Sequence, residues 1–190
     1  ILAGVPVVFS GIDHPSLDAD LQSADWLTGI GERIDIERNI DLALMLWPET
    51  RRILLLGDRT EIAATHRRAA EPLQQKYADR VRIETLVPES RAALRGELAA
   101  LRPDDLVFYL HYHWTEVDGF LKFEDIVPEI AELSPVPTIG AWDFSIELGM
   151  TAGYVTTGYR QGAESAKCAI DILNGTPVSS IPVHDDVANS

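Results

Sequence analysis

The sequence predicts an α/β protein built on a parallel, doubly wound sheet of five strands. From Arg52 onward, short aliphatic runs alternate with segments whose apolar residues recur at helical spacing. The clearest run, residues 53–56, is continuous rather than alternating with polar residues, which is typical of a strand buried on both faces. Helices are expected between most successive strands, and such crossovers join parallel neighbours.

The elements of this sheet are predicted in chain order. The strands lie at residues 53–56, 81–86, 106–110, 137–139 and 153–156. Helices are expected at residues 60–77, from a Ser90 cap to residue 101, and at residues 123–133. Pro72 lies inside the first of these helices and should kink or interrupt it, because proline removes a backbone hydrogen bond.

The N-terminal part is predicted to contribute two extended segments and one helix. Residues 5–10 should form a buried strand, and residues 11–15 the loop that leaves its carboxyl end. Residues 26–32 should form the second extended segment. Asp35 is expected to cap a helix that Pro48 ends.

The C-terminal part is predicted to hold a long helix over residues 159–174, which Gly175 ends. Its apolar residues recur at helical spacing and are expected to form the buried stripe: Tyr159, Ala163, Ala166, Ile170 and Leu173. Small residues on this stripe would let the helix lie close to a sheet.

The composition limits what kind of protein this is. With 190 residues and 46% hydrophobic content, the chain is able to bury a substantial core. Its 16 basic and 30 acidic residues give a net charge of −14, which argues against a nucleic-acid partner. The single cysteine, Cys168, excludes an internal disulfide framework and a cysteine metal site. The chain begins at Ile1 without methionine, so we expect a processed or shortened chain.

The last third of the sequence carries a recognisable pattern. A strand opened by Pro137 is followed by Trp142-Asp143-Phe144, by Gly-Tyr-Val-Thr-Thr-Gly-Tyr at residues 153–159, and by Ile-Leu-Asn-Gly at residues 172–175. This pattern resembles the C-terminal part of ABC transporter substrate-binding proteins of the tryptophan- and tyrosine-binding type. It is also similar to the related periplasmic sensor domains of histidine kinases and diguanylate cyclases. Upstream segments agree, so the resemblance covers nearly the whole chain.

The resemblance implies a type I periplasmic-binding-protein-like fold. Residues 33–157 would be the complete second lobe, residues 1–32 the end of the first lobe with the first crossing, and residues 158–190 the return helix and strand toward the first lobe. A substantial part of the first lobe would then precede Ile1. The resemblance also implies a small organic, amino-acid-like ligand in an inter-lobe cleft, and a periplasmic or extracellular location, with or without a membrane anchor. The implied partners are an ABC permease or a fused sensor kinase or cyclase, and a homodimer is conceivable.

The candidate ligand-binding residues are those near the carboxyl ends of the predicted strands, where ligands of open α/β sheets gather. They are Ser10, Asp13, Arg59, Thr60, His111, Tyr112, His113, Trp142, Asp143, Phe144, Thr157 and Tyr159.

Several of these residues have an ordinary structural alternative. Arg59 could hold a ligand carboxylate through two hydrogen bonds, or form an ion pair in a solvated turn. Asp143, flanked by rings, could pair with a ligand ammonium, or hydrogen-bond across a hinge. Thr157 could help to bind a carboxylate at a helix N-terminus, or simply cap that helix.

His111 and His113 are two residues apart, so on a strand their imidazoles would share a face. They could hold one metal ion, with an oxygen ligand from Glu116, Asp118 or Asp143. We nevertheless predict no metal site, because two histidines without a third fixed ligand seldom suffice. No cofactor is predicted.

No catalytic motif is present: the sequence contains no Gly-x-Ser-x-Gly elbow and no phosphate-binding glycine loop before a helix. We therefore predict a binding or sensor domain rather than an enzyme. The alternative is a cytoplasmic flavodoxin-like enzyme or regulator that uses the same sheet, since a fold by itself does not fix a function.

Overall fold

The computed structural model describes residues 4–13 and 24–185. The chain divides into two compact units, which are described here separately. The central unit comprises Asp35–Tyr154, and the terminal unit comprises Ile1–Ile34 with Val155–Ser190. The domain boundaries at residues 33 and 157 that the resemblance implies stay a prediction.

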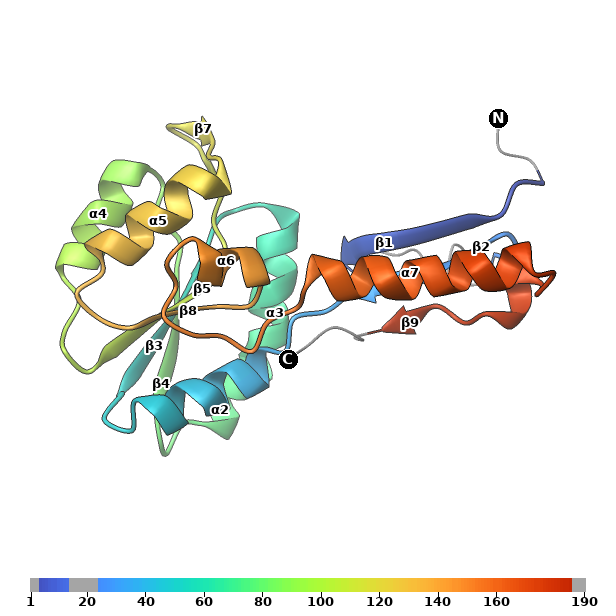
Figure 1. Cartoon of the computed structure of the whole chain (residues 1–190). Coiled ribbons are helices and arrows are strands. Elements are labelled where there is room, and N and C mark those ends of the chain that lie inside the picture. Colours follow the sequence, from blue (N-terminus) through green and yellow to red (C-terminus); the bar gives the residue numbers. More distant parts are fainter. Residues whose placement is uncertain (1–3, 14–23, 186–190) are drawn as a thin grey trace. The chain divides into compact units, whose positions relative to one another are not determined.

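The central unit is built on a parallel sheet with the strand order β4-β3-β5-β8 (Figure 1). Its strands are β3 (Arg52–Gly57), β4 (Arg82–Leu86), β5 (Asp105–His111) and β8 (Thr138–Gly140). In the register of the sheet, Leu55 of β3 pairs with Thr85 on one side and with Phe108 on the other. The predicted α/β class with a parallel sheet is confirmed.

This sheet has four strands among the described residues, rather than the five predicted. Residues 153–156 form no strand, and Ala152, just before them, makes an isolated bridge with Ile139. The reason lies in the buried Asn39, whose side chain donates to Tyr154 O at 2.9 Å and accepts from Tyr154 N at 2.8 Å. The amide of Asn39 therefore takes the backbone groups that a neighbouring strand would otherwise pair.

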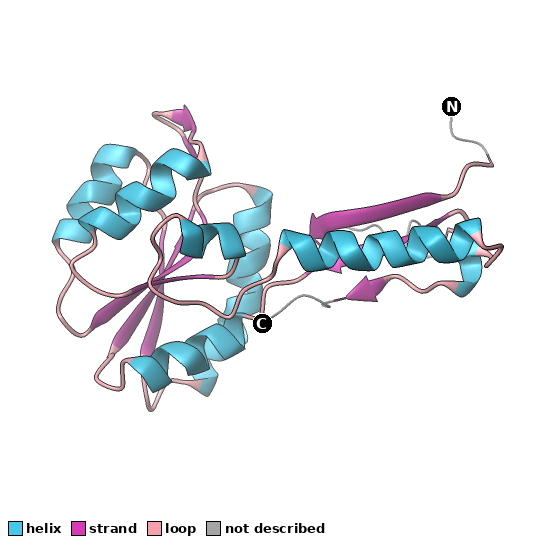
Figure 2. Ribbon diagram, viewed as in Figure 1, coloured by secondary structure: helices cyan, strands magenta, loops and turns pink. Residues whose placement is uncertain are grey.

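Helices cover both faces of the central sheet (Figure 2). They are α2 (Ile36–Leu46), α3 (Glu61–Lys76), α4 (Arg91–Ala99), α5 (Phe123–Leu133) and α6 (Asp143–Glu147). The side chains of Asp35, Thr60 and Ser90 accept a hydrogen bond from the backbone three residues on, so these residues cap their helices. Pro72 lies inside α3 without ending it.

The hydrophobic core of the central unit follows the alternation of side chains along the strands. Leu54, Leu56 and Val107 face one layer with α4 and α5, where Leu94 and Ile126 are among the buried residues. The short elements β6 (Trp114–Thr115) and β7 (Gly119–Phe120) form an antiparallel hairpin after β5, in a region predicted to be loop.

The terminal unit contains the strands β1 (Val7–Asp13), β2 (Leu27–Glu32) and β9 (His184–Asp185), which pair in parallel in the order β1-β2-β9. Residues 11–13 therefore belong to β1 and not to a loop. The pairing shifts between Ser10 and Ile12, where Gly11 adopts a φ of 69°.

The helix α7 (Gly158–Leu173) packs on β1 and β2 and is followed by the short turn η2 (Val178–Ser180). The stripe predicted to be buried is wrong, because Tyr159, Ile170 and Leu173 are 86%, 55% and 85% exposed. Gln161 and Cys168 are the buried residues of α7, and Gln161 donates to Glu32 and to Thr156. Hydrogen bonds of Gln161 thus help to hold this face of the helix against the sheet. Among the described residues, no helix is long and apolar enough to cross a membrane.

Candidate functional site

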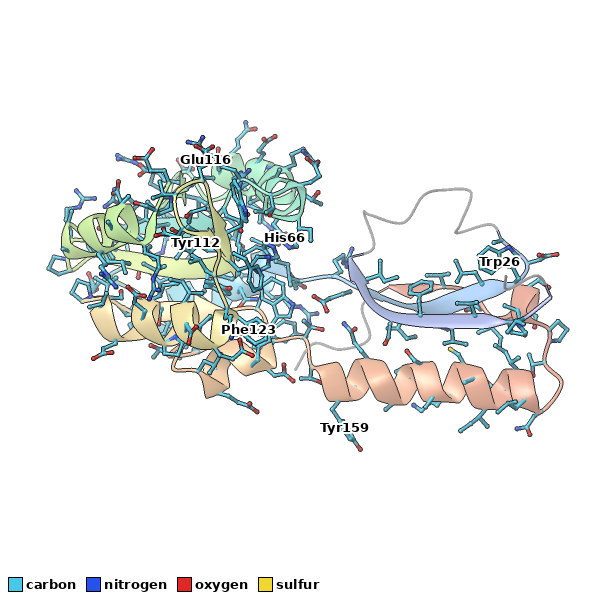
Figure 3. The ribbon with its side chains drawn as sticks, turned by 90° about the horizontal axis from the view of Figure 1, so that it is seen from above. Trp26, His66, Tyr112, Glu116, Phe123 and Tyr159 are labelled. Atoms are coloured by element: carbon cyan, nitrogen blue, oxygen red, sulfur yellow. The ribbon has the colours of Figure 1, made fainter. Side chains whose placement is uncertain are left out.

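The carboxyl ends of β3, β5 and β8 meet at one edge of the central sheet, which we call the carboxyl edge. The three strands end at Gly57, His111 and Gly140, and the loops that follow carry most of the predicted site residues. Figure 3 shows the side chains of the central unit, with His66 and Phe123 labelled. In open α/β sheets this edge is where ligands bind.

Asp58 joins two of these strand ends and is 1% exposed. Its Oδ1 accepts hydrogen bonds from Thr60 N at 2.8 Å and Thr60 Oγ1 at 2.5 Å. Its Oδ2 accepts from His113 N at 3.0 Å and Trp114 N at 3.1 Å. The carboxylate thus fixes the loop after β5 against the loop after β3. Sequence reasoning left Asp58 out of the site, because nothing local connects it to residue 113.

Arg59 and Thr60 lie beside Asp58 but have different partners. Arg59 Nη1 donates to Glu116 Oε1 at 2.8 Å, and both side chains are more than half exposed. The sequence offered an ion pair within the turn as the alternative to ligand binding, and the partner is instead Glu116 of a distant segment. Thr60 caps α3 by accepting from Ala63 N at 3.4 Å.

Three histidine rings lie together at the carboxyl edge. The ring centroids of His66, on α3, and His111 are 6.2 Å apart, and those of His111 and His113 are 3.8 Å apart. Within the part of the chain that the structure describes, the buried Nε2 atom of His111 has no hydrogen-bond partner. Burial lowers the pKa of His66 to about 4. Burial, followed by the neighbouring His113, lowers the pKa of His111 to about 4. At neutral pH, His66 and His111 are therefore uncharged.

The histidines belong to a longer series of aromatic contacts, which we call the ring row. His113 lies 5.9 Å from Phe120 at one end, and Trp142 lies 5.9 Å from His66 in the middle. Trp142 stacks on Phe144 at 6.1 Å, and Phe144 is 4.7 Å from Phe123. The members, in order of contact, are Phe120, His113, His111, His66, Trp142, Phe144 and Phe123.

The segment from Trp142 to Phe144 begins the short helix α6, where the sequence predicted a loop. Ser145 Oγ donates to Trp142 O at 2.5 Å and helps to form this turn. A Cβ atom at Gly140 would lie 2.0 Å from that same Ser145 Oγ, so the turn requires glycine at the end of β8. Asp143 Oδ1 accepts from Phe144 N at 2.8 Å, which directs part of its carboxylate to its own helix.

Tyr112, predicted to line the ligand site, is buried in the core, whereas His111 and His113 on either side of it are half-buried. It is fully buried in the core cluster of the central unit, with Leu54, Leu121 and Ile126 in the same cluster. The register between β3 and β5 shifts here, because Tyr109 and His111 pair with consecutive residues of β3, and beyond this irregularity Tyr112 lies in the same core cluster as Tyr109. We therefore remove Tyr112 from the candidate site.

The remaining candidates belong to the terminal unit. Ser10 is exposed within β1, and Thr157 caps α7 by accepting from Arg160 N at 3.2 Å. Tyr159 is 86% exposed and points away from α7 (Figure 3). Asp13 is the last residue of β1, and its side chain lies outside the described residues. The part of these residues in ligand binding stays a prediction.

One group of side chains has the composition of a metal site. A carboxylate oxygen of Asp58 and one ring nitrogen each from His111 and His113 all lie within 4.8 Å of one another. The oxygen donors expected from the sequence were Glu116, Asp118 and Asp143, and Asp58 stands in their place.

Comparison with known proteins adds a family and several related folds. A family model described as "ABC transporter substrate binding protein" matches residues 2–189. No curated protein matches the sequence.

Three solved structures share the fold at low sequence identity. The first is a substrate-binding protein with adhesive properties from Clostridium difficile, in a ligand-free, open structure. Its TM-score is 0.73 at 16% identity, and the match covers 98% of this chain and 63% of that protein. A conserved domain protein from Vibrio cholerae has a TM-score of 0.69 at 18% identity, and the match covers 97% of this chain and 62% of that protein. An ABC domain in complex with L-Trp from Streptococcus pneumoniae has a TM-score of 0.70 at 16% identity, and the match covers 97% of this chain and 64% of that protein. The chain thus spans less than two thirds of each of these proteins.

Proposed function

The chain belongs to the ABC transporter substrate-binding protein family, and we propose that it binds a small organic solute at the carboxyl edge of its central sheet. The resemblance predicted from the sequence is thereby confirmed. The family consists of binding proteins, which favours binding over catalysis and disfavours the alternative of a flavodoxin-like enzyme. The observation that carries the proposal is the ring row, which gathers seven aromatic or imidazole rings at the edge where such sheets bind ligands.

We propose an amino acid or a similar solute with a flat side chain as the ligand. Rings offer planar apolar faces against which another ring stacks or packs edge to face. His66 and His111 are uncharged at neutral pH, so this part of the row adds polar atoms without adding charge. The relative from Streptococcus pneumoniae, which is in complex with L-Trp, supports this class of ligand.

Two residues are proposed to bind the charged groups of such a solute. Asp143 lies between Trp142 and Phe144 and would pair with the ammonium group, since neighbouring rings exclude water and strengthen the attraction. Arg59 would bind the carboxylate, for which it must exchange its partner Glu116. An exposed ion pair of this kind is weak, so the exchange costs little.

The biological setting that we propose is extracytoplasmic, as is typical of this family. The protein would deliver its solute to an ABC permease, and the inter-lobe cleft, the homodimer and the role as a sensor for a kinase or cyclase stay predictions. The reading frame around the gene separates the two settings: a neighbouring permease gene supports transport, and a fused kinase or cyclase supports sensing.

The proposal is tested by thermal shift and calorimetry on the full-length protein with a panel of amino acids and aromatic acids. At least one compound should raise the melting temperature, and Asp143→Ala and Trp142→Ala should each weaken its binding at least tenfold. Glu147→Ala, an exposed carboxylate on the same helix, is the matched control and should bind normally. Equal affinity in all three variants would remove the carboxyl edge from the site.

A further inference from the structure

We propose that Asp58, His111 and His113 form a binding site for a divalent transition-metal ion. Nothing in the proposed solute binding requires such an ion, so this inference goes beyond it. The sequence argued against a metal because two histidines lacked a third fixed ligand, and the fold supplies that ligand from residue 58.

The spacing of the donor atoms suits one ion. The three atoms lie within 4.8 Å of one another. Around a tetrahedral zinc ion with bonds of about 2.1 Å, ligand atoms are about 3.4 Å apart. The donor atoms must therefore approach one another by at most about 1.4 Å to share one ion. Imidazole nitrogen with carboxylate oxygen is a ligand set that zinc accepts.

One ring nitrogen of His111 also lacks a hydrogen-bond partner among the described residues. His111 Nε2 is buried without a hydrogen bond among the described residues. A buried polar atom in this state is unfavourable, and native proteins rarely leave one unexplained. A metal ion would provide the missing partner and use the lone pair that a neutral imidazole offers.

The carboxylate is held in place before any ion binds. Asp58 N donates to His111 O at 2.8 Å, and the Asp58 side chain accepts from the backbone of His113 and Trp114. Hydrogen bonds of this kind orient metal ligands in known sites. Each carboxylate oxygen of Asp58 already accepts two hydrogen bonds, so the ion must displace one of the four donors. The Thr60 hydroxyl is the one of these four donors that can rotate away.

The test uses the full-length protein after dialysis against a chelator and then into chelator-free buffer. Zinc is titrated by calorimetry, and Co²⁺ is titrated while its visible absorption is recorded. We expect one ion per chain with a dissociation constant in the micromolar range. His111→Ala and His113→Ala should each weaken zinc binding at least tenfold and reduce the cobalt bands that report nitrogen and oxygen ligands.

The matched control is His184→Ala, an exposed histidine in β9 that should leave zinc binding unchanged. If an alanine variant fails to fold, His113→Phe retains a ring of similar size and removes the nitrogen donors. The absence of saturable binding in the parent protein, or binding of unchanged affinity in the His111 and His113 variants, would overturn the proposal. Solute binding measured with and without chelator is a separate result, so either proposal is able to fail alone.

Discussion

The two edges of the central sheet place charged and polar residues in opposite situations. At the amino edge, Arg52 donates to both carboxylate oxygens of the buried Asp105, at 2.8 and 2.6 Å. Arg102 N also donates to this carboxylate, at 2.7 Å. Arg52 Nη1 donates to Glu84 Oε2 at 3.3 Å. Every charge in this group has an opposite charge beside it.

At the carboxyl edge, the buried carboxylate of Asp58 is held by backbone N–H groups and a hydroxyl, with no cation among its hydrogen-bond partners. Beside it lie the neutral His66 and His111, one of which has an unpaired nitrogen. The two edges of the same sheet therefore differ in role: the amino edge is assigned to stability and the carboxyl edge to ligand binding. Complete ionic pairing at the amino edge is expected to stabilise the fold, whereas at the carboxyl edge His111 Nε2 has no partner among the described residues and the proposed ligands would bind there.

The largest effect is expected from Arg52→Met, which leaves Asp105 buried without its cation. Loss of one partner of a buried pair costs about 3–5 kcal/mol, and urea denaturation should show a decrease of this size in the free energy of unfolding. Solute and zinc affinities should not change. Arg51→Met is the control, since the neighbouring Arg51 forms only a 3.7 Å exposed pair with Glu49. A loss below about 1 kcal/mol would mean that the amino edge does not have the stabilising role assigned to it.

Asp58→Ala should destabilise the protein less, by about 2–3 kcal/mol, because it leaves three backbone N–H groups without their acceptor. Unlike the Arg52 variant, it should also weaken zinc binding and solute binding. Urea denaturation and calorimetry on the same preparation separate the two effects. Asp58→Asn retains one acceptor oxygen and should give an intermediate stability. Full ligand affinity in Asp58→Ala would break the distinction between the edges.

Acidification should act on the carboxyl edge first. The folded pKa of His66, about 4, lies below the unfolded value of 6.5, so the unfolded state binds more protons between these values. Its contribution to stability is complete above pH 6.5 and is lost as the pH falls toward 4. For this one group the loss from pH 7 to pH 5 should be about 2 kcal/mol, measured by denaturation in the presence of a chelator.

The amino edge should respond only at lower pH. Burial, the largest single cause, raises the pKa of Asp105, but the hydrogen bonds and positive charges of Arg52 and Arg102 together outweigh it and lower the pKa below the ordinary value of 3.8. The stability from this carboxylate is therefore present above pH 3.8 and is lost as the pH falls through the lower folded pKa. His66→Phe should reduce the slope of the stability profile between pH 7 and 5 by about half, because the lowered pKa of His111 supplies the rest, and should leave the acid limb intact. An unchanged profile would exclude His66 as the group responsible.

The smallest effect on stability is expected from Arg59→Ala, at less than about 0.5 kcal/mol, because exposed ion pairs contribute little. The proposed solute should nevertheless bind more weakly, which calorimetry would detect. Glu116→Ala, which frees Arg59, is the matched variant and should bind at least as tightly as the parent. If Arg59→Ala unfolds at a much lower urea concentration, the residue belongs with the structural pairs.

Local sequence signals predicted most of the fold. Strands and caps were readable because the relevant interactions lie within a few residues, as with Asp35 and Ser90. The missing fifth strand was not readable, because it depends on Asn39 and a partner 115 positions away. The orientation of α7 depends in the same way on Gln161 and the distant Glu32.

The candidate site was predicted only in part, because some of its contacts join residues that are far apart in the sequence. Strand ends indicated His111, His113 and Trp142, which the structure brings into one ring row. The burial of Tyr112 could not be predicted from alternation, because a register shift after Tyr109 places Tyr112 in the same core cluster as Tyr109. Asp58 required knowledge that the backbone of residue 113, 55 positions later, returns to it.

The absence of room for a side chain at Gly140 constrains how the proposed solute site could change its preference. Any side chain there would collide with Ser145 and displace the first turn of α6, and with it Trp142 and Asp143 together. Adaptation to a new solute is therefore expected to exchange the outer rings, such as Phe120 and Phe123, one at a time. A mutant library aimed at altered selectivity should hold residue 140 constant and randomise those positions instead.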